Sequence, residues 1–181
     1  MKPVLMIHEV REWMLDLPLE DYILTFDDGL YSQYFYFDHF KKLKTEKYFF
    51  ISTNIVCPEH VAQSNDFPTC EDAHKSFFEN QSTSHYMKWS QIKEIYQTPN
   101  CFIGGHSHNH HRHDEKSIEK LYQNLNSDTE AMLSEFAKQG MKVESFCYPY
   151  NKQYVLYETL LKKKEFKIFF GDERIAIESL Q

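Results

Sequence analysis

Two short stretches of this sequence carry side chains that could bind a metal ion. Asp27 and Asp28 follow an apolar run, and His106 and His110 follow a pair of glycines. Adjacent carboxylates repel each other unless a cation lies beside them, and two imidazoles four residues apart can be aimed at one ion. One aspartate and two histidines around a metal, with one position left open, form a catalytic zinc site rather than a structural one.

Metal-assisted hydrolysis is the chemistry that these residues predict. A metal held by Asp28, His106 and His110 would acidify a bound water and polarise a carbonyl oxygen. Asp27, which adjoins Asp28, would then be free to take the proton from that water. Two simpler interpretations stay open: an acidic turn for the carboxylates, and a surface tract that picks up metal incidentally for the histidines.

The composition narrows the class of protein. A chain of 181 residues with 41% hydrophobic residues predicts one globular domain over residues 1–181. A formal net charge of -7 without a basic stripe argues against nucleic acid as the main partner. The 4 cysteines contain no CxxC pair, so neither a zinc finger nor a small disulfide scaffold is expected. Apolar runs are too short for a signal peptide or a membrane span of about 20 residues, so a cytoplasmic protein is expected.

Apolar and amphipathic segments alternate along the chain and predict an α/β fold with a largely parallel sheet. Strands are expected at residues 4–7, 22–26, 48–51, 101–103, 143–148, 166–170 and 174–177. Helices are expected at residues 31–44, 90–96, 117–139 and 154–164.

Residues 57–87 interrupt this alternation. They are polar and contain Pro58 and Pro68 among many Ser, Asn and Asp residues, which predicts a long functional loop or a disordered insertion. Histidines 60, 74 and 85 fall in this stretch and receive no role, because lone histidines in a polar loop mostly face solvent.

The candidate residues share a position relative to the predicted strands. Asp27, Asp28, His106, His110 and Tyr150 all follow the C-terminal end of a strand. Parallel strands place these ends on one face, where α/β sheets and barrels carry their chemistry. We therefore expect the five residues to meet at one site.

Three ordered motifs in this sequence resemble the polysaccharide deacetylases with a NodB homology domain, carbohydrate esterase family 4. They are Thr25-Phe26-Asp27-Asp28-Gly29, His106-Ser107-x-x-His110 and Phe146-Cys147-Tyr148-Pro149-Tyr150. The resemblance covers about residues 4–177. It implies a distorted (β/α) barrel with fewer than eight repeats that hydrolyses N- or O-acetyl groups on sugars.

The resemblance also implies a metal centre. Asp28, His106 and His110 would bind the divalent ion, most often zinc in this family, although cobalt, nickel and manganese also suit two histidines and one aspartate. Asp27 would be the general base. Ser107 would support the histidine loop through hydrogen bonds.

The third motif would supply the substrate side of the site. The backbone N–H of Tyr150 would help to hold the tetrahedral oxyanion, and its ring would line the substrate groove. Pro149 has no N–H and would fix the turn, and with Tyr148 it would belong to the substrate-binding segment. Without the family, Tyr148 to Tyr150 would be an aromatic strand end.

The sequence departs from the family pattern at two places. Cys147 stands where fuller members have an arginine that orients the catalytic aspartate, and no histidine follows His113, so the late Leu-x-His general acid is missing. A leaving amine must still be protonated, which leaves the metal-bound water, a loop histidine such as His108 or a partner chain. Arg174-Ile175 resembles a pair in some members and receives no defined role.

The sequence thus predicts a metal-dependent amide hydrolase that deacetylates an N-acetylated amino sugar. The expected cytoplasmic location favours a glycan precursor, as in the synthesis of a surface glycan, over a finished wall polymer. An alternative is a deacetylase-like protein that binds metal and sugar but has lost turnover. A hydrolase of phosphate esters is disfavoured, because the motifs have no Gly-rich phosphate cradle or Lys/Arg cluster nearby.

Overall fold

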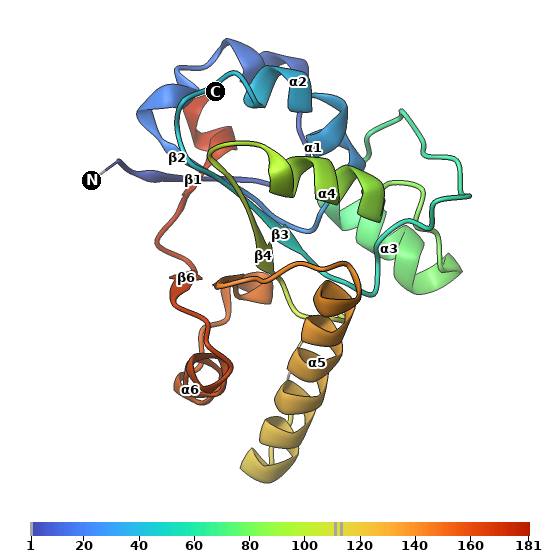
Figure 1. Ribbon diagram of the computed structural model, residues 1–181, viewed down its shortest axis with the longest axis vertical. Coiled ribbons are helices and arrows are strands. Elements are labelled where there is room, and N and C mark those ends of the chain that lie inside the picture. The colour runs from blue at the N-terminus through green and yellow to red at the C-terminus, as the bar shows by residue number, and fades with distance from the viewer. Residues whose placement is uncertain (1, 111, 113) are drawn as a thin grey trace.

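A parallel β-sheet organises the molecule. The computed structural model describes residues 2–110, 112 and 114–181. Within them, a 7-stranded sheet has the order β6-β5-β4-β3-β2-β1-β7, and it curls into part of a barrel (Figure 1). The strands are β1 (Val4–Ile7), β2 (Ile23–Phe26), β3 (Lys47–Ile51), β4 (Cys101–Gly105), β5 (Ser145–Cys147), β6 (Ile168–Phe170) and β7 (Ile175–Ala176). This architecture confirms the predicted distorted (β/α) barrel with fewer than eight repeats.

All the paired strands run parallel, so their C-terminal ends meet on one face. In the β1–β2 pair, Ile7 lies opposite Phe26, which places the residues after both strands side by side. The last strand, β7, pairs with the first, β1, through Leu5 and Ile175. The two ends of the chain therefore contribute to the same edge of the sheet.

Helices surround this sheet, with α1, α2 and α4 in the upper part of Figure 1 and α5 and α6 in the lower part. They are α1 (Tyr31–Phe35), α2 (Phe37–Phe40), α3 (Cys70–Asn80), α4 (Trp89–Gln97), α5 (Ile118–Lys138) and α6 (Val155–Lys163). Helix α4 packs on β4, and α5 packs on α6. The start of α5 is capped by the Ser117 hydroxyl, and Gly140 follows its end with a φ of +72°.

Two stretches differ from the sequence prediction. The single helix expected at 31–44 is divided into α1 and α2, because Tyr36 has φ -95° and ψ 9° and so leaves the helical conformation between them. In the polar stretch 57–87, residues 70–80 form helix α3, with the Thr69 hydroxyl accepting a hydrogen bond from the Asp72 N–H at its start. Helix α3 carries a short apolar stripe at helical spacing, made of Cys70, Ala73 and Phe77, and the polar, proline-containing stretch around it obscured this pattern in the sequence.

Aromatic side chains fill much of the core between the sheet and α2. Phe26 stacks on Phe49 with ring centroids 4.4 Å apart, and Phe40 meets Phe26 edge-on at 4.9 Å. A second, smaller cluster joins α3 to the segments that follow β2 and β3 and precede α4, and it is made of Leu30, Ile55, Ala73, Phe77 and Tyr86. Helix α3 is thus anchored by apolar contacts of its own.

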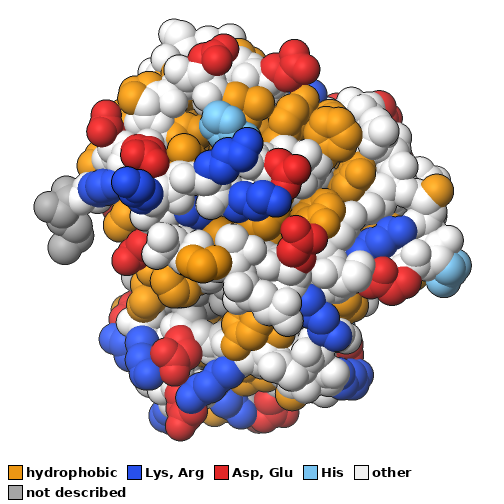
Figure 2. Space-filling view, turned by 45° about the horizontal axis from the view of Figure 1, so that its top comes forward, with side chains coloured by type: hydrophobic (Ala, Val, Ile, Leu, Met, Phe, Trp, Pro, Cys, Tyr) orange, Lys and Arg blue, Asp and Glu red, His pale blue; other side chains and the backbone are white. Residues whose placement is uncertain are grey.

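The surface mixes charges of both signs. On the face shown in Figure 2, Lys and Arg side chains alternate with Asp and Glu side chains. Across the described residues, every helix is too short or too polar to cross a lipid bilayer.

Candidate active site

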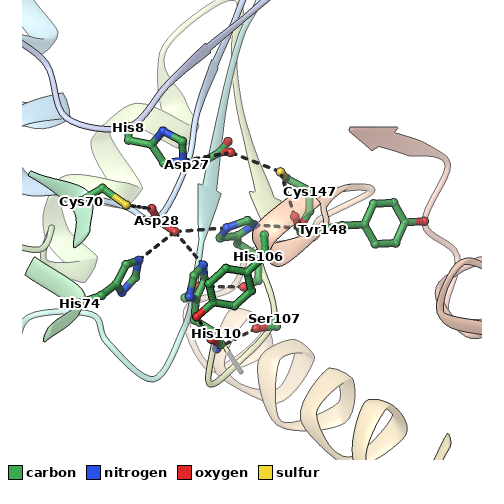
Figure 3. Close-up of polar contacts among 12 residues, drawn as sticks. His8, Asp27, Asp28, Cys70, His74, His106, Ser107, His110, Cys147 and Tyr148 are labelled. Carbon is green, nitrogen blue, oxygen red and sulfur yellow. Dashed lines mark hydrogen bonds and ion pairs between the residues drawn. The ribbon is translucent and has the colours of Figure 1, made fainter. Parts of the chain in front are cut away.

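One carboxylate oxygen lies at the centre of the predicted metal site. Asp28 follows β2, and His106 and His110 follow β4. The Nε2 atoms of His106 and His110 lie 3.2 and 3.0 Å from Asp28 Oδ1. Among the described residues this oxygen has no hydrogen-bond partner although it is buried. The structure therefore brings the three predicted ligands together around an unsatisfied oxygen (Figure 3).

Left-handed backbone turns aim these side chains at one another. Asp28, Ser107 and His110 have φ values of 71°, 63° and 53°, a region that costs a non-glycine residue about 1–3 kcal/mol. The Ser107 hydroxyl accepts a hydrogen bond from the His110 N–H at 2.9 Å. Ser107 thus has a direct contact through which it can fix the histidine loop.

The hydrogen bond of His106 sets its tautomer. Its Nδ1 lies 2.8 Å from the carbonyl oxygen of Cys147. Because a carbonyl oxygen only accepts, Nδ1 carries the proton, and a neutral ring then turns the lone pair of Nε2 toward Asp28. A lone pair and a carboxylate oxygen repel each other unless a cation lies between them. A buried set of two imidazoles and one carboxylate is also the donor chemistry of zinc and related ions. The residues therefore fit a divalent metal.

The charge states at this site suit the same role. Burial would raise the pKa of Asp28, but His110, His106 and His74 hold it well below its ordinary value of 3.8. Burial lowers the pKa of His110 below its usual 6.5, which favours the neutral, metal-binding form. In the metal-free protein, burial also opposes protonation of His106, but Asp28 outweighs it and raises that pKa.

Asp27 lies in a different environment from its neighbour. Arg174 Nη1 lies 2.8 Å from Asp27 Oδ1, and both side chains of this ion pair are buried. The Cys147 thiol donates to Asp27 Oδ2 at 3.5 Å. Burial would raise the pKa of Asp27, but Arg174 lowers it below 3.8. Asp27 is therefore an anion at neutral pH.

Arg174 has a defined position at this site, which the sequence did not supply. Besides Asp27, it donates to the Thr25 hydroxyl, the Asn151 side chain and the Gly171 carbonyl. It immediately precedes β7, whose pairing with β1 carries it to the site. The arginine that is missing at position 147 is thus matched by one that arrives from a different strand.

His8 is a site residue that sequence reasoning missed. It follows β1, its Nε2 lies 3.9 Å from Asp27 Oδ2, and its side chain is 31% exposed. Because Ile7 pairs with Phe26, His8 and Asp27 are the next residues of two neighbouring parallel strands. The register of the first two predicted strands was the signal that could have found it.

Helix α3 brings two further side chains to Asp28. His74 Nε2 lies 3.3 Å from Asp28 Oδ1, and the Cys70 thiol lies 3.1 Å from Asp28 Oδ2. The sequence analysis gave His74 no role. The spacing of Cys70 and His74, four residues apart, puts both on one face of a helix, but this signal needs the helix itself to be recognised.

The third motif divides between the pocket and the core. Tyr150 is 44% exposed, and its hydroxyl donates to the His110 carbonyl at 3.2 Å. The Tyr148 ring points away from Asp28 (Figure 3) and packs in the core on Phe146 and Tyr157. Tyr148 nevertheless also lines the cavity beside Asp28. Pro149 is buried in the turn between Tyr148 and Tyr150.

His108 points to other partners than Asp28. His108 Nδ1 lies 2.8 Å from the Thr53 hydroxyl, and its N–H donates to Asp128. His111 and His113, weak candidates for an extra ligand, lie outside the described residues.

These side chains line one cavity of about 350 Å³. Its walls include His8, Asp27, Asp28, His106, His110 and Tyr150, together with Cys70 and His74 from α3. The cavity is large enough for one sugar-sized group and brings a candidate base, a candidate metal site and an imidazole together.

Comparison with known proteins agrees with the motifs. Residues 17–169 match the polysaccharide deacetylase family. No curated protein matches the chain.

Solved structures share its fold at low sequence identity. IcaB from Ammonifex degensii is similar with a TM-score of 0.69 and 21% identity, over 97% of this chain and 84% of that one. A de-N-acetylase from Aggregatibacter actinomycetemcomitans gives 0.68 and 14%, over 96% and 92%. The BpsB deacetylase domain from Bordetella bronchiseptica gives 0.66 and 15%, over 96% and 93%.

Proposed function

Because this chain belongs to the polysaccharide deacetylase family, we propose that it is a metal-dependent hydrolase that removes the acetyl group from an N-acetylated amino sugar of a glycan or glycan precursor. The observation that carries the proposal is the pair of unlike carboxylates in one cavity. Asp28 has an unsatisfied oxygen among imidazoles, and Asp27 is ionised beside Arg174. Asp28 is thus suited to bind a metal ion, and Asp27 is suited to act as the general base.

Asp28, His106 and His110 would hold the ion, with zinc favoured and cobalt, nickel or manganese also compatible with this donor set. When bound, the ion supplies a more acidic water and a polarised acetyl carbonyl. The Nδ1 proton of His106, fixed by the Cys147 carbonyl, keeps the ring in the tautomer that a ligand requires.

Asp27 is the proposed general base. Its carboxylate takes a proton from the attacking water as the water oxygen bonds to the acetyl carbon. Arg174 keeps Asp27 ionised and fixes Oδ1, so Oδ2, which accepts from the Cys147 thiol at 3.5 Å and keeps a second lone pair, is the oxygen that receives the proton. The backbone N–H of Tyr150 is the proposed donor to the resulting oxyanion.

His8 is the proposed general acid. When the carbon–nitrogen bond breaks, the leaving amine nitrogen needs a proton, and an imidazole at the cavity wall can deliver it. His8 lies on the Asp27 side of the cavity, 3.9 Å from Oδ2, and so can give up a proton close to where Asp27 gains one. It would fill the role of the missing late histidine, which favours turnover over the alternative of binding alone.

Acetate release from N-acetylated sugars tests this function. Wild type and Asp27→Asn are compared, both loaded with metal and with metal content measured. A drop of roughly 10²–10⁴-fold in Asp27→Asn, at unchanged metal content, is expected for the loss of a general base. One metal per chain without acetate from any sugar would instead identify a binding relative. Absence of stoichiometric metal would overturn the site.

A further inference from the structure

Helix α3 faces the metal site with two side chains that the proposed mechanism does not use. Cys70 and His74 lie one turn apart and approach different oxygens of the same carboxylate. The Cys70 thiol lies 3.1 Å from Asp28 Oδ2, and His74 Nε2 lies 3.3 Å from Asp28 Oδ1. Figure 3 shows both reaching Asp28 from the side opposite His106.

We infer that α3 forms an outer shell of the metal centre, in which Cys70 and His74 hold the carboxylate of Asp28 and set the affinity of the centre for its ion. The inference rests on the metal site of the proposed function and deepens it. It assigns a positioning role to a segment whose histidines the sequence left without one.

Two contacts hold His74 beside Asp28. Its Nδ1 hydrogen-bonds the Tyr86 hydroxyl at 3.1 Å. Its ring stacks on His110, with centroids 4.3 Å apart and planes 13° from parallel. Its Nε2 is buried and, among the described residues, meets no hydrogen-bond partner of good geometry. A buried polar atom without a partner is costly, so a nitrogen fixed beside Asp28 points to a contact that the loaded site completes.

Cys70 is also fixed where the helix begins. Its N–H donates to Glu9 Oε2 at 3.0 Å, which ties the start of α3 to the segment after β1. The short distance to Asp28 Oδ2 identifies the sulfur as an S–H donor, since a thiolate would repel the carboxylate. This donor occupies Oδ2, while the imidazoles of His106 and His110 gather at Oδ1.

The geometry separates His74 from the three proposed ligands, and it places Cys70 in a different group of donor atoms, with His8 and Asp28. Within the described part of the chain, the donor atoms of Asp28, His106 and His110 all lie within 4.8 Å of one another, and this group does not include His74. Partners outside a ligand set fix the orientation of the ligands, and their loss typically costs about 10- to 100-fold in metal affinity. We expect the loss of Cys70 or His74 to lower the metal affinity by a similar factor.

Paired variants test the inference. Cys70→Ala and His74→Ala remove the contacts, whereas Cys70→Ser and His74→Gln keep an O–H or N–H donor at a similar reach. His60→Ala, an exposed histidine of the same polar stretch, is the matched control. Affinity for Zn²⁺ and Co²⁺ is measured by competition with a chromophoric chelator, and the visible spectrum of the Co²⁺ form reports the ligand set.

Both alanine variants should lose roughly 10- to 100-fold in affinity. Serine and glutamine should restore most of it, and the Co²⁺ spectrum should stay close to wild type, because the ligands are unchanged. Thermal unfolding of the metal-free proteins checks that each variant is folded.

Several results would overturn this role. Unchanged metal affinity in both alanine variants would show that Cys70 and His74 do not set it. Folded serine and glutamine variants that recover none of the lost metal affinity would contradict the proposed role as well. A Co²⁺ spectrum altered in His74→Ala would make His74 a ligand instead of an outer-shell residue. A wild type that binds no metal would overturn the proposed function as well, whereas a metal-binding wild type with unaffected variants would overturn only the role of α3.

Discussion

Asp27 and Asp28 are neighbours in the chain and are equally buried, each with 2% of its surface exposed, yet their charges are balanced in different ways. Asp27 faces a guanidinium 2.8 Å away. Asp28 faces imidazoles and a thiol. A guanidinium is always charged, whereas an imidazole that binds a metal is neutral, and the Cys70 thiol is an uncharged S–H donor.

The comparison shows how adjacent carboxylates can take different tasks. Asp27 has its cation built into the chain, which leaves it ionised but free to exchange a proton. Asp28 has no guanidinium beside it, and under the proposed function a metal ion balances its charge. The change in backbone conformation at Asp28, with φ at 71°, separates the two side chains into these environments.

The largest expected effect comes from Asp28→Asn, which removes the charge that an ion would balance. Metal content should fall from one per chain to near zero. Acetate release should fall by roughly 10³-fold or more, because a catalytic metal supplies several kcal/mol of transition-state stabilisation. Metal analysis and acetate assays check this, with the exposed acid Asp38→Asn as control. Full metal occupancy in Asp28→Asn would show that Asp28 is not a metal ligand, and the proposed difference in role between Asp28 and Asp27 would be wrong.

His8→Ala should impair the proton transfer to the leaving amine and leave metal binding by Asp28 unchanged. Deacetylation of an N-acetyl sugar should slow by roughly 10²–10⁴-fold, the range for loss of a general acid, while metal content stays at the wild-type level. An acetyl ester with a phenolate leaving group needs no such proton and should lose far less. Equal losses on the amide and on the ester would refute the role of His8 as an acid.

Arg174→Gln should change the pH dependence of the reaction. Arg174 holds the pKa of Asp27 below 3.8 against the effect of burial, so its removal raises that pKa, and the acid limb of the kcat/KM profile should move toward neutral pH. Arg174→Lys keeps a positive charge and should move the limb less. An acid limb that stays in place in Arg174→Gln would show that the ion pair does not control the base.

The smallest effect concerns the stability of the metal-free protein in acid. Both carboxyls have folded pKa values below 3.8, so the unfolded chain binds more protons as the pH falls. Their contribution to the free energy of unfolding is fully present above about pH 5, since the unfolded carboxyls have pKa values near 4, and is lost as the pH falls through the folded values. Urea unfolding between pH 7 and pH 3 measures it. Asp27→Asn should show a smaller loss than wild type, and an equal loss would assign acid sensitivity to other groups.

The sequence predicted the candidate site best where polar residues directly follow a predicted strand. The polar ends of β2 and β4 stand out because each follows a short buried run, and the family match supports the fold built from them. The metal and catalytic roles of these residues stay predictions until they are measured.

The site residues that the sequence did not predict are brought to the site by contacts between distant parts of the chain. Arg174 is separated from Asp27 by 147 residues and meets it only because β7 pairs with β1. Helix α3 has a helical apolar stripe, but it buries only two apolar side chains and lies within a polar stretch that was predicted to be a loop, so Cys70 and His74 were not placed on one helical face. His8 was within reach, because the register of two neighbouring parallel strands places it beside Asp27.

The pairing of β7 with β1 also has a consequence for synthesis on the ribosome. Chains emerge from their N-terminus, so Asp27, Asp28 and both ligand histidines leave the ribosome long before Arg174, which arrives with the last strand. Until then Asp27 has no guanidinium to balance it. A nascent chain therefore carries its proposed metal ligands before Arg174 is available, and the ion pair that holds Asp27 forms only after β7 has been made.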